Sequence, residues 1–156
     1  MISVSWNGHA ETAYKVAVQD TYPSWGWWIV NGATTLLENW NLEATRDISD
    51  NHMMFGEIGG WFFKGLGGIK PDREAPGFKH ILLRPNFVGV DAFEAWHDAP
   101  CGRIVSAWTR RGNTVTYRVR IPANSTATLY LPANVDGGKV HQLGAGSHTL
   151  TLRVAK

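Results

Sequence analysis

The chain has 156 residues, 44% of them hydrophobic, which is enough for one ordinary soluble domain or two small ones. Its formal net charge is only +2, and its basic residues are scattered, so we expect no nucleic-acid partner. Cys101 is the single cysteine, which excludes an internal disulfide framework and a zinc site built on several thiolates. The apolar runs are too short for a membrane helix, and the first residues lack the pattern of an export signal. We therefore expect a soluble chain without a membrane partner, in a compartment that the sequence leaves open.

The first part of the chain has the apolar spacing of helices. The run AETAYKVAVQD predicts a helix over residues 10–20, with apolar side chains at steps of three and four. A second helix is predicted from about residue 29 to residue 40. A third is predicted to begin after an N-cap at Ser49, Asp50 or Asn51 and to end at Gly67 and Gly68.

After residue 70 the pattern changes to short stretches of period two, separated by turn residues. The predicted strands are KHILLRP, VDAFEAWHD, GRIVSAWTRR, TVTYRVRIP, TATLYLP, GKVHQL and SHTLTLRVA. Gly112 and Asn113 suit a tight hairpin between two of them. About seven antiparallel strands in ninety-odd residues indicate a β-sandwich. The stretch HMMFGEIGGWFFKGLGG is apolar nearly all round, so the helical part is expected to need neighbours beyond those encoded here.

Glu38 is a lone carboxylate in the apolar run ATTLLENW. If the second helix is central in its fold, this acid is at least partly buried and needs a partner or a task. If the helix is peripheral, Glu38 is an ordinary surface residue. Six of the eight tryptophans precede residue 70, and aromatic rings with a carboxylate are typical of a carbohydrate cleft, although tryptophans are more often part of a core.

His52 follows Asp50 and Asn51 at the predicted start of the third helix. It is either a neighbour of the helix cap or a neutral imidazole that exchanges a hydrogen bond with a sugar hydroxyl. The other candidate acids could equally be ordinary surface residues, and we assign them no role: Glu57, Asp72, Glu74, Asp91 and Glu94. The histidines lack metal-binding spacing, and no phosphate loop, dinucleotide fingerprint or nucleophile elbow occurs, so we expect neither metal nor cofactor.

Four stretches of the sequence resemble the C-terminal end of bacterial α-L-rhamnosidases. They are AYKVAVQDTYPSWGWWIVNGATTLLENWN, SDNHMMFGEIGGWFFKGLGGIKPD, PGFKHILLRPN and GRIVSAWTRRGNTVTYRVRIPANSTATLYLP. The resemblance implies an α+β multidomain fragment, in which the last helices of a six-hairpin α/α barrel precede an antiparallel β-sandwich. The implied boundaries are residues 1–68 for the helical segment and 69–156 for the sandwich. It also implies inverting hydrolysis of terminal α-L-rhamnose, with a rhamnose-containing carbohydrate as partner.

The resemblance also implies roles for three residues. The glutamate of the family motif GATTLWERW is the general base and matches Glu38 in GATTLLENW. The family histidine that contacts rhamnose matches His52 in NHMMFG, and Trp25 in YPSWGW matches the aromatic lining of the sugar pocket. Two departures follow: the segment ENWNLEATRDISDNH is shorter than in the family, and the stretch that carries the general acid has no counterpart.

We therefore expect the isolated chain to be inactive, because an inverting glycosidase needs two carboxyl groups. One alternative is a non-catalytic carbohydrate-binding module in which the β-sandwich acts. Another is a homo-oligomer formed through exposed apolar helices.

Overall fold

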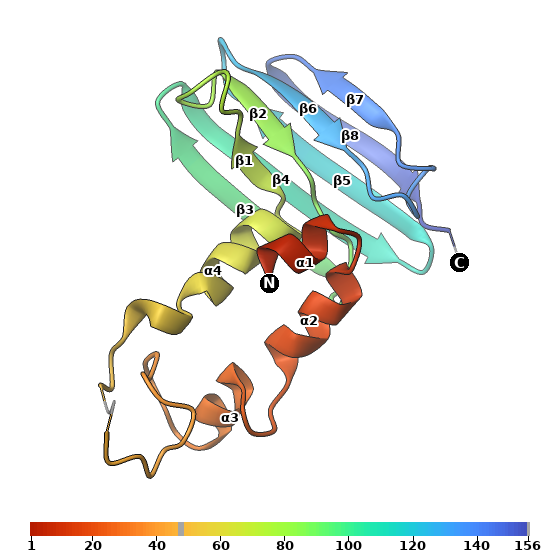
Figure 1. Cartoon of the computed structure of the whole chain (residues 1–156). Helices are drawn as coiled ribbons and strands as arrows, with labels where there is room; N and C mark the ends of the chain where they lie inside the picture. Colours follow the sequence, from red (N-terminus) through yellow and green to blue (C-terminus); the bar gives the residue numbers. More distant parts are fainter. Residues whose placement is uncertain (47–48, 156) are drawn as a thin grey trace. The chain divides into compact units, whose positions relative to one another are not determined.

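The computed structural model describes residues 1–46 and 49–155. The chain divides into two compact units, Met1–Trp61 and Phe62–Lys156. The first unit is helical and the second consists almost entirely of β-strands (Figure 1). No helix in the described part of the chain is both long enough and apolar enough to cross a bilayer.

Short helices make up the regular structure of the first unit. They are α1 (Ile2–Trp6), α2 (Ala10–Val18), α3 (Trp25–Val30), the 3-10 helix η1 (Met53–Phe55) and α4 (Glu57–Trp61). Helix α2 confirms the prediction for residues 10–20 and buries Ala10, Ala13 and Ala17 on one face. Helix α1 was not predicted, because five residues are too few to show an apolar period. The buried Ser5 of α1 instead accepts a hydrogen bond of 2.7 Å from the Trp61 indole.

The predicted helix over residues 29–40 is wrong, since α3 ends at Val30 and Glu38 lies in a loop. Gly32 has a φ of 89°, in the left-handed region that glycine adopts without strain. The Gly32 amide donates to the carbonyl oxygen of Ile29, and the Ala33 amide donates to that of Trp28. This pair of bonds is a Schellman motif, which closes the end of a helix. The dipeptide Asn-Gly thus ends the helix that apolar spacing alone extended to Trp40.

The third predicted helix is broken into three pieces. Its cap is His52, not Ser49, Asp50 or Asn51: His52 Nδ1 accepts a 3.1 Å hydrogen bond from the Met54 amide. After η1 and α4, residues Phe62–Leu66 form the π-helix η2 of the second unit. The predicted end is confirmed, since Gly68 has a φ of 72° and the strand β1 begins at Ile69.

The second unit contains eight strands in two four-stranded sheets. They are β1 (Ile69–Pro71), β2 (His80–Leu83), β3 (Ala92–Ala99), β4 (Gly102–Arg111), β5 (Thr114–Ile121), β6 (Thr126–Tyr130), β7 (Val140–Leu143) and β8 (Gly146–Arg153). One sheet has the order β1-β2-β6-β7 and the other β3-β4-β5-β8. All seven predicted strands are present, and the short β1 is additional. The pairing is not wholly antiparallel, because β2 and β6 run parallel.

The core of the second unit lies between its two sheets. Strand β5 alternates strictly, with its even-numbered side chains outside and Val115, Tyr117, Val119 and Ile121 buried. Trp108, also buried, donates a 3.2 Å hydrogen bond from its indole nitrogen to the carbonyl oxygen of Leu66. This bond fixes η2 against the interior of the sandwich.

Tyr117 carries the most deeply buried ionisable group in this core. Its hydroxyl lies 2.9 Å from Ser106 Oγ, which donates a 2.6 Å hydrogen bond to the carbonyl oxygen of Gly67. Burial raises the pKa of Tyr117 above its usual value of about 10. As pH rises past about 10 the unfolded chain loses this proton first, so the folded state loses stability.

We expect Tyr117→Phe to lower the free energy of unfolding by about 1 kcal/mol near neutral pH, through the lost hydrogen bond. The variant should also lack the decline above pH 10, which reaches about 1.4 kcal/mol for one pH unit. Urea denaturation at pH 8 and pH 11 tests this. The control is Tyr130→Phe, since Tyr130 is half-buried and its ring packs on the Arg84 guanidinium. If the wild type and Tyr117→Phe differed equally in stability at both pH values, ionisation of Tyr117 would not contribute to the loss of stability at high pH.

Candidate functional site

Two segments of the first unit pair with each other and bring Glu38 and His52 together. The Glu38 amide donates to the carbonyl oxygen of Ser49 at 3.0 Å, and the His52 amide donates to that of Leu36 at 2.8 Å. The hydroxyl of Thr35 donates to the carbonyl oxygen of Asp50. Residues 35–38 thus lie alongside residues 49–52 without forming regular strands. This pairing replaces the predicted helix as the element that positions Glu38.

One oxygen of the Glu38 carboxylate accepts a hydrogen bond from the backbone, and the other faces His52 without a direct hydrogen bond. Oε2 accepts a 3.2 Å hydrogen bond from the Ser49 amide. Oε1 lies 3.8 Å from Nε2 of His52. The side chain is 26% exposed, so water can reach it while the chain partly encloses it. A partly enclosed carboxylate held by one backbone amide can accept a proton through its second oxygen.

The hydrogen bond to His52 Nδ1 determines the tautomer of this imidazole. Nδ1 accepts from the Met54 amide and so carries no proton. In the neutral ring the proton is therefore on Nε2, the nitrogen that faces Glu38. His52 accordingly caps η1 with one nitrogen and presents an N–H donor with the other.

The gap between Glu38 and His52 is suited to one oxygen atom. At 3.8 Å their closest polar atoms are too far apart for a direct hydrogen bond. An oxygen of water or of a sugar hydroxyl can lie about 2.8 Å from both. Such an oxygen would accept from His52 and donate to Glu38. The arrangement can therefore hold a hydroxyl group or a water molecule that is about to lose a proton.

An aromatic cluster of four side chains, Trp25, Trp28, Trp40 and Phe55, supports both segments of the site. Trp28 is 2% exposed, stacks on Trp40 at 4.3 Å between ring centroids and meets Phe55 edge-on at 5.4 Å. Its indole donates to the carbonyl oxygen of Asn39, next to Glu38, at 3.1 Å. The cluster thus fixes the backbone on one side of the Glu38 carboxylate.

Trp25, the residue predicted to line a sugar pocket, belongs to this cluster. Its indole donates a 3.0 Å hydrogen bond to the carbonyl oxygen of Phe55, and its ring meets Trp40 edge-on at 5.5 Å. The side chain is half-buried, so part of the ring is available to a ligand. Packing against the other aromatic rings and contact with a sugar are both compatible with this position.

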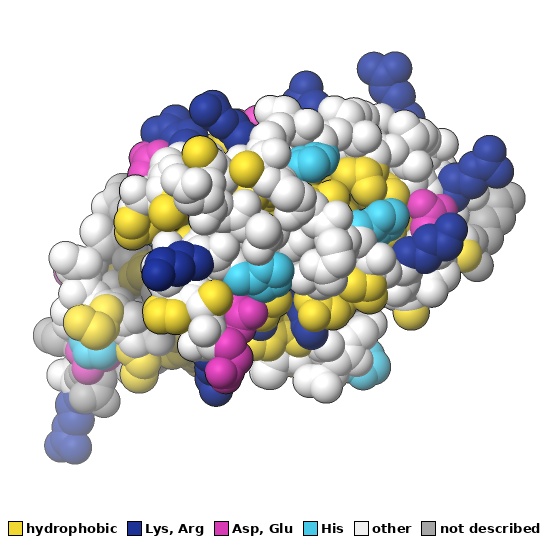
Figure 2. All heavy atoms as spheres, turned by 90° about the horizontal axis from the view of Figure 1, so that it is seen from above, with side chains coloured by type: hydrophobic (Ala, Val, Ile, Leu, Met, Phe, Trp, Pro, Cys, Tyr) yellow, Lys and Arg dark blue, Asp and Glu magenta, His cyan; other side chains and the backbone are white. Residues whose placement is uncertain are grey.

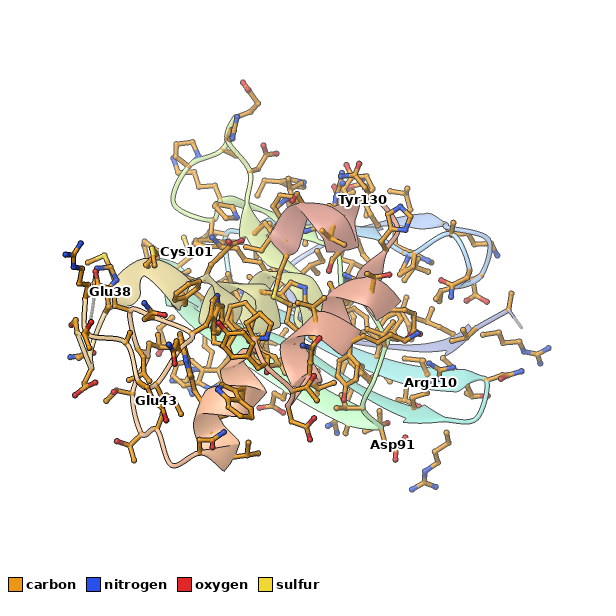
Figure 3. All side chains as sticks on the ribbon, turned by 60° about the horizontal axis from the view of Figure 1, so that its bottom comes forward. Glu38, Glu43, Asp91, Cys101, Arg110 and Tyr130 are labelled. Carbon is orange, nitrogen blue, oxygen red and sulfur yellow. The ribbon has the colours of Figure 1, made fainter. Side chains whose placement is uncertain are left out.

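A small hollow of about 60 Å³ lies in the same loop region, and its lining includes none of Glu38, His52 and Trp25. Its lining consists of Leu37, Asn39, Asn41, Leu42, Ala44, Ser49 and Asp50. This volume holds a few water molecules. Figure 3 shows Glu43 at a separate place on the same loop, and Glu43 and Glu57 are both exposed. Among the described carboxylates of this unit, only that of Glu38 is not exposed.

Two contributors to the site were not predicted from the sequence. Ser49 was considered only as a helix cap, whereas its amide holds Glu38 Oε2. Phe55 was not considered, although it joins the tryptophans in the aromatic cluster. The sequence signal for Phe55 is its position three residues after His52, within one turn. In the part of the chain that the structure describes, no group of three or more His, Cys, Asp and Glu side chains could hold a metal ion.

Two family patterns match the chain, one for each part. Residues 1–66 match the bacterial alpha-L-rhamnosidase 6 hairpin glycosidase domain, and residues 68–146 match the bacterial alpha-L-rhamnosidase C-terminal domain. These matches identify the class of the protein as glycoside hydrolases. The chain belongs to the bacterial α-L-rhamnosidase family.

Curated relatives have the same family name. An alpha-L-rhamnosidase of Streptomyces avermitilis is 29% identical over 168 residues, which cover 93% of this chain and 16% of the relative. An alpha-L-rhamnosidase of Alteromonas sp. is 33% identical over 135 residues, which cover 81% of this chain and 14% of the relative. The chain thus spans about a sixth of the length of these relatives.

Solved structures of similar fold are also rhamnosidases. An α-L-rhamnosidase from Dictyoglumus thermophilum has a TM-score of 0.85 and 29% identity, over 96% of this chain and 20% of that one. The Streptomyces avermitilis enzyme complexed with L-rhamnose has a TM-score of 0.83 and 29% identity, over 95% of this chain and 16% of that one.

Proposed function

We propose that this chain contributes the general base and one sugar contact to the active site of an inverting α-L-rhamnosidase. The observation that carries the proposal is the geometry of Glu38 and His52, whose facing atoms leave room for one shared oxygen. Membership in the family supports rhamnose as the sugar. In this proposal Glu38 accepts a proton from the attacking water, His52 donates Nε2–H to a hydroxyl, and Trp25 contacts the sugar ring.

An inverting hydrolase needs a second carboxyl group that protonates the leaving oxygen, roughly 6.5 to 9.5 Å from the base. We propose that this acid comes from protein beyond the 156 residues, so that the isolated chain does not turn over. The short span of the chain relative to its relatives supports this proposal. General acid catalysis contributes on the order of 10² to 10⁴ in rate, so its loss suppresses turnover severely.

We further propose that the first unit together with η2 corresponds to the last helices of a six-hairpin α/α barrel, with the domain boundary after residue 68, although the compact units divide after Trp61. Its exposed apolar side chains support this proposal, since Ile29 is 70% exposed, Val30 65% and Met53 88%. Further barrel helices would cover them. The same side chains offer a surface for self-association, and a monomeric mass at working concentration would remove that second possibility.

The experiment that tests the proposed function is a titration of the chain with L-rhamnose, followed by tryptophan fluorescence. We expect a saturable change with a dissociation constant on the order of millimolar, because Trp25 lies in the proposed site. His52→Asn should abolish the change, since asparagine keeps the helix cap but cannot reach the sugar. His9→Ala is the matched control, because His9 makes no capping bond from its side chain. An unchanged wild-type spectrum would contradict the proposal.

Hydrolysis of an aryl α-L-rhamnoside tests the assignment of the base. We expect no turnover by the wild-type chain or by Glu38→Gln. If the wild-type chain turned over and Glu38→Gln did not, Glu38 would be supported as the base. The proposal that the general acid lies outside these residues would then be refuted. Turnover that survives the substitution would remove Glu38 from the mechanism.

A further inference from the structure

The outer face of the sheet β3-β4-β5-β8 is rich in arginine. On β5, Val115, Tyr117, Val119 and Ile121 point into the core, so the side chains between them point outward. The register then places further outward side chains on the neighbouring strands. We call this surface the arginine face, and its basic residues are Arg103, Arg111, Arg118, Arg120 and Arg153, all exposed.

The charge of the arginine face is unbalanced. Its strand carboxylates are Glu94 and Asp98 on β3, against five arginines, and Asp136 lies next to Arg153, whose amide donates to Asp136 Oδ1. Asp98 is already engaged, because its two oxygens accept hydrogen bonds of 2.7 and 2.9 Å from Arg103. The whole chain has a net charge of only +2, so this face is more basic than the chain as a whole. Figure 2 shows Lys and Arg side chains in several separate groups on the face in view.

Small residues separate the central arginines from their neighbours. Arg120 pairs with Val105 on one side and Ser147 on the other, and Arg118 pairs with Ala107 and Thr149. Along a strand, alternate residues are roughly 6.6 Å apart, so the two guanidinium groups form a short row above a low surface. No ion pair of Arg118 or Arg120 occurs among residues 1–46 and 49–155. Both are therefore available to an anionic ligand.

Trp96 adds an aromatic element to the same face. It is 52% exposed and lies beside Val105 in the register. The Arg103 guanidinium lies 4.2 Å from the centre of its ring, and Asp98 holds that guanidinium in place. An exposed indole fixed beside a row of arginines offers both stacking and charge to one ligand.

We propose that the arginine face binds an anionic polysaccharide whose sugars carry carboxylates. Guanidinium groups bind carboxylates through two parallel hydrogen bonds, and the low surface between them admits an extended chain. The choice of a sugar polymer over other polyanions rests on membership in a glycoside hydrolase family. It does not depend on Glu38 or His52, which lie in the other unit.

Affinity electrophoresis of the chain in gels with polygalacturonate or neutral dextran tests this proposal. We expect retardation by polygalacturonate alone, with weaker binding at high salt. The variant Arg118→Gln/Arg120→Gln should bind about 5- to 10-fold more weakly, because two exposed charge pairs are lost. The control Lys79→Gln/Lys139→Gln removes the same charge from exposed residues that precede β2 and β7 in the other sheet, and should bind like the wild type.

Equal loss in both double variants would overturn the proposal in favour of unspecific charge attraction. Equal retardation by dextran, or equally tight binding of single-stranded RNA, would overturn it as well. Thermal unfolding of each variant controls for folding, and the substituted side chains are all exposed. The rhamnose titration should be unchanged in Arg118→Gln/Arg120→Gln, which separates this proposal from that of the Glu38 site.

Discussion

Replacing Gly68 with alanine is expected to lower the free energy of unfolding of the second unit by more than about 3 kcal/mol. Two effects add at this position. Gly68 has a φ of 72°, a left-handed conformation that disfavours alanine by roughly 1 to 2 kcal/mol. A Cβ there would also overlap Pro85 N and Arg84 C and lie 2.7 Å from Arg84 O. These are backbone atoms, so relief requires movement of the chain between η2 and β1.

The matched control for this variant is Gly77→Ala. Gly77 has a φ of 75°, but a Cβ there would meet no atom within 4 Å. It should therefore show only the conformational penalty of roughly 1 to 2 kcal/mol. Urea denaturation followed by circular dichroism measures both variants. If Gly68→Ala and Gly77→Ala were destabilised equally, the close approach of Gly68 to Arg84 and Pro85 would not contribute to the loss of stability.

Replacing Trp28 with alanine is the second substitution with a large expected effect. Loss of a fully buried tryptophan typically costs about 3 to 5 kcal/mol. Here it also removes the stack on Trp40 and the hydrogen bond to the Asn39 carbonyl oxygen. We expect the loop that carries Glu38 to detach from residues 49–52. The first unit, with only short helices, has little other packing to offset this loss.

Amide hydrogen exchange gives a local measurement of this effect. The Glu38 and His52 amides are both hydrogen-bonded across the site and should lose protection in Trp28→Ala. Trp27→Ala is the control, because Trp27 is half-buried and lies outside the aromatic cluster, with an edge contact to Tyr22 at 6.0 Å. Unchanged protection of both amides in Trp28→Ala would contradict the role given to the cluster.

The strands were easier to predict from sequence than the helices. In the β-sandwich the period of two is imposed by a core that these same residues supply, so each predicted strand is present. The helix predicted from Ile29 to Trp40 is absent because the hydrogen bonds from the Gly32 and Ala33 amides end α3. The apolar spacing of the following residues does not indicate this end. The parallel pairing of β2 with β6 was also missed, since pairing direction depends on how distant segments meet.

The sequence motifs indicated which residues belong to the candidate site, but not how they are arranged in space. Glu38 and His52 were selected from the motifs GATTLLENW and NHMMFG. Their approach to 3.8 Å depends on backbone bonds between residues 35–38 and 49–52, which no local pattern encodes. The His52 cap also escaped prediction, because imidazole nitrogen is an uncommon acceptor at a helix start. The roles of Glu38, His52 and Trp25 in catalysis stay predictions.

The parallel ladder between β2 and β6 has a consequence for how the second unit acquires its fold. Residues 84–125 lie between these two strands and include the whole of β3, β4 and β5. Pairing β2 with β6 first would close a long loop and so cost much chain entropy. The strands β3, β4 and β5 are close in sequence, so their meander forms at a lower entropic cost. We therefore expect the meander to form early and the β2-β6 ladder late. Until then one edge of β2 stays open, and nascent chains are most exposed to aggregation at that stage.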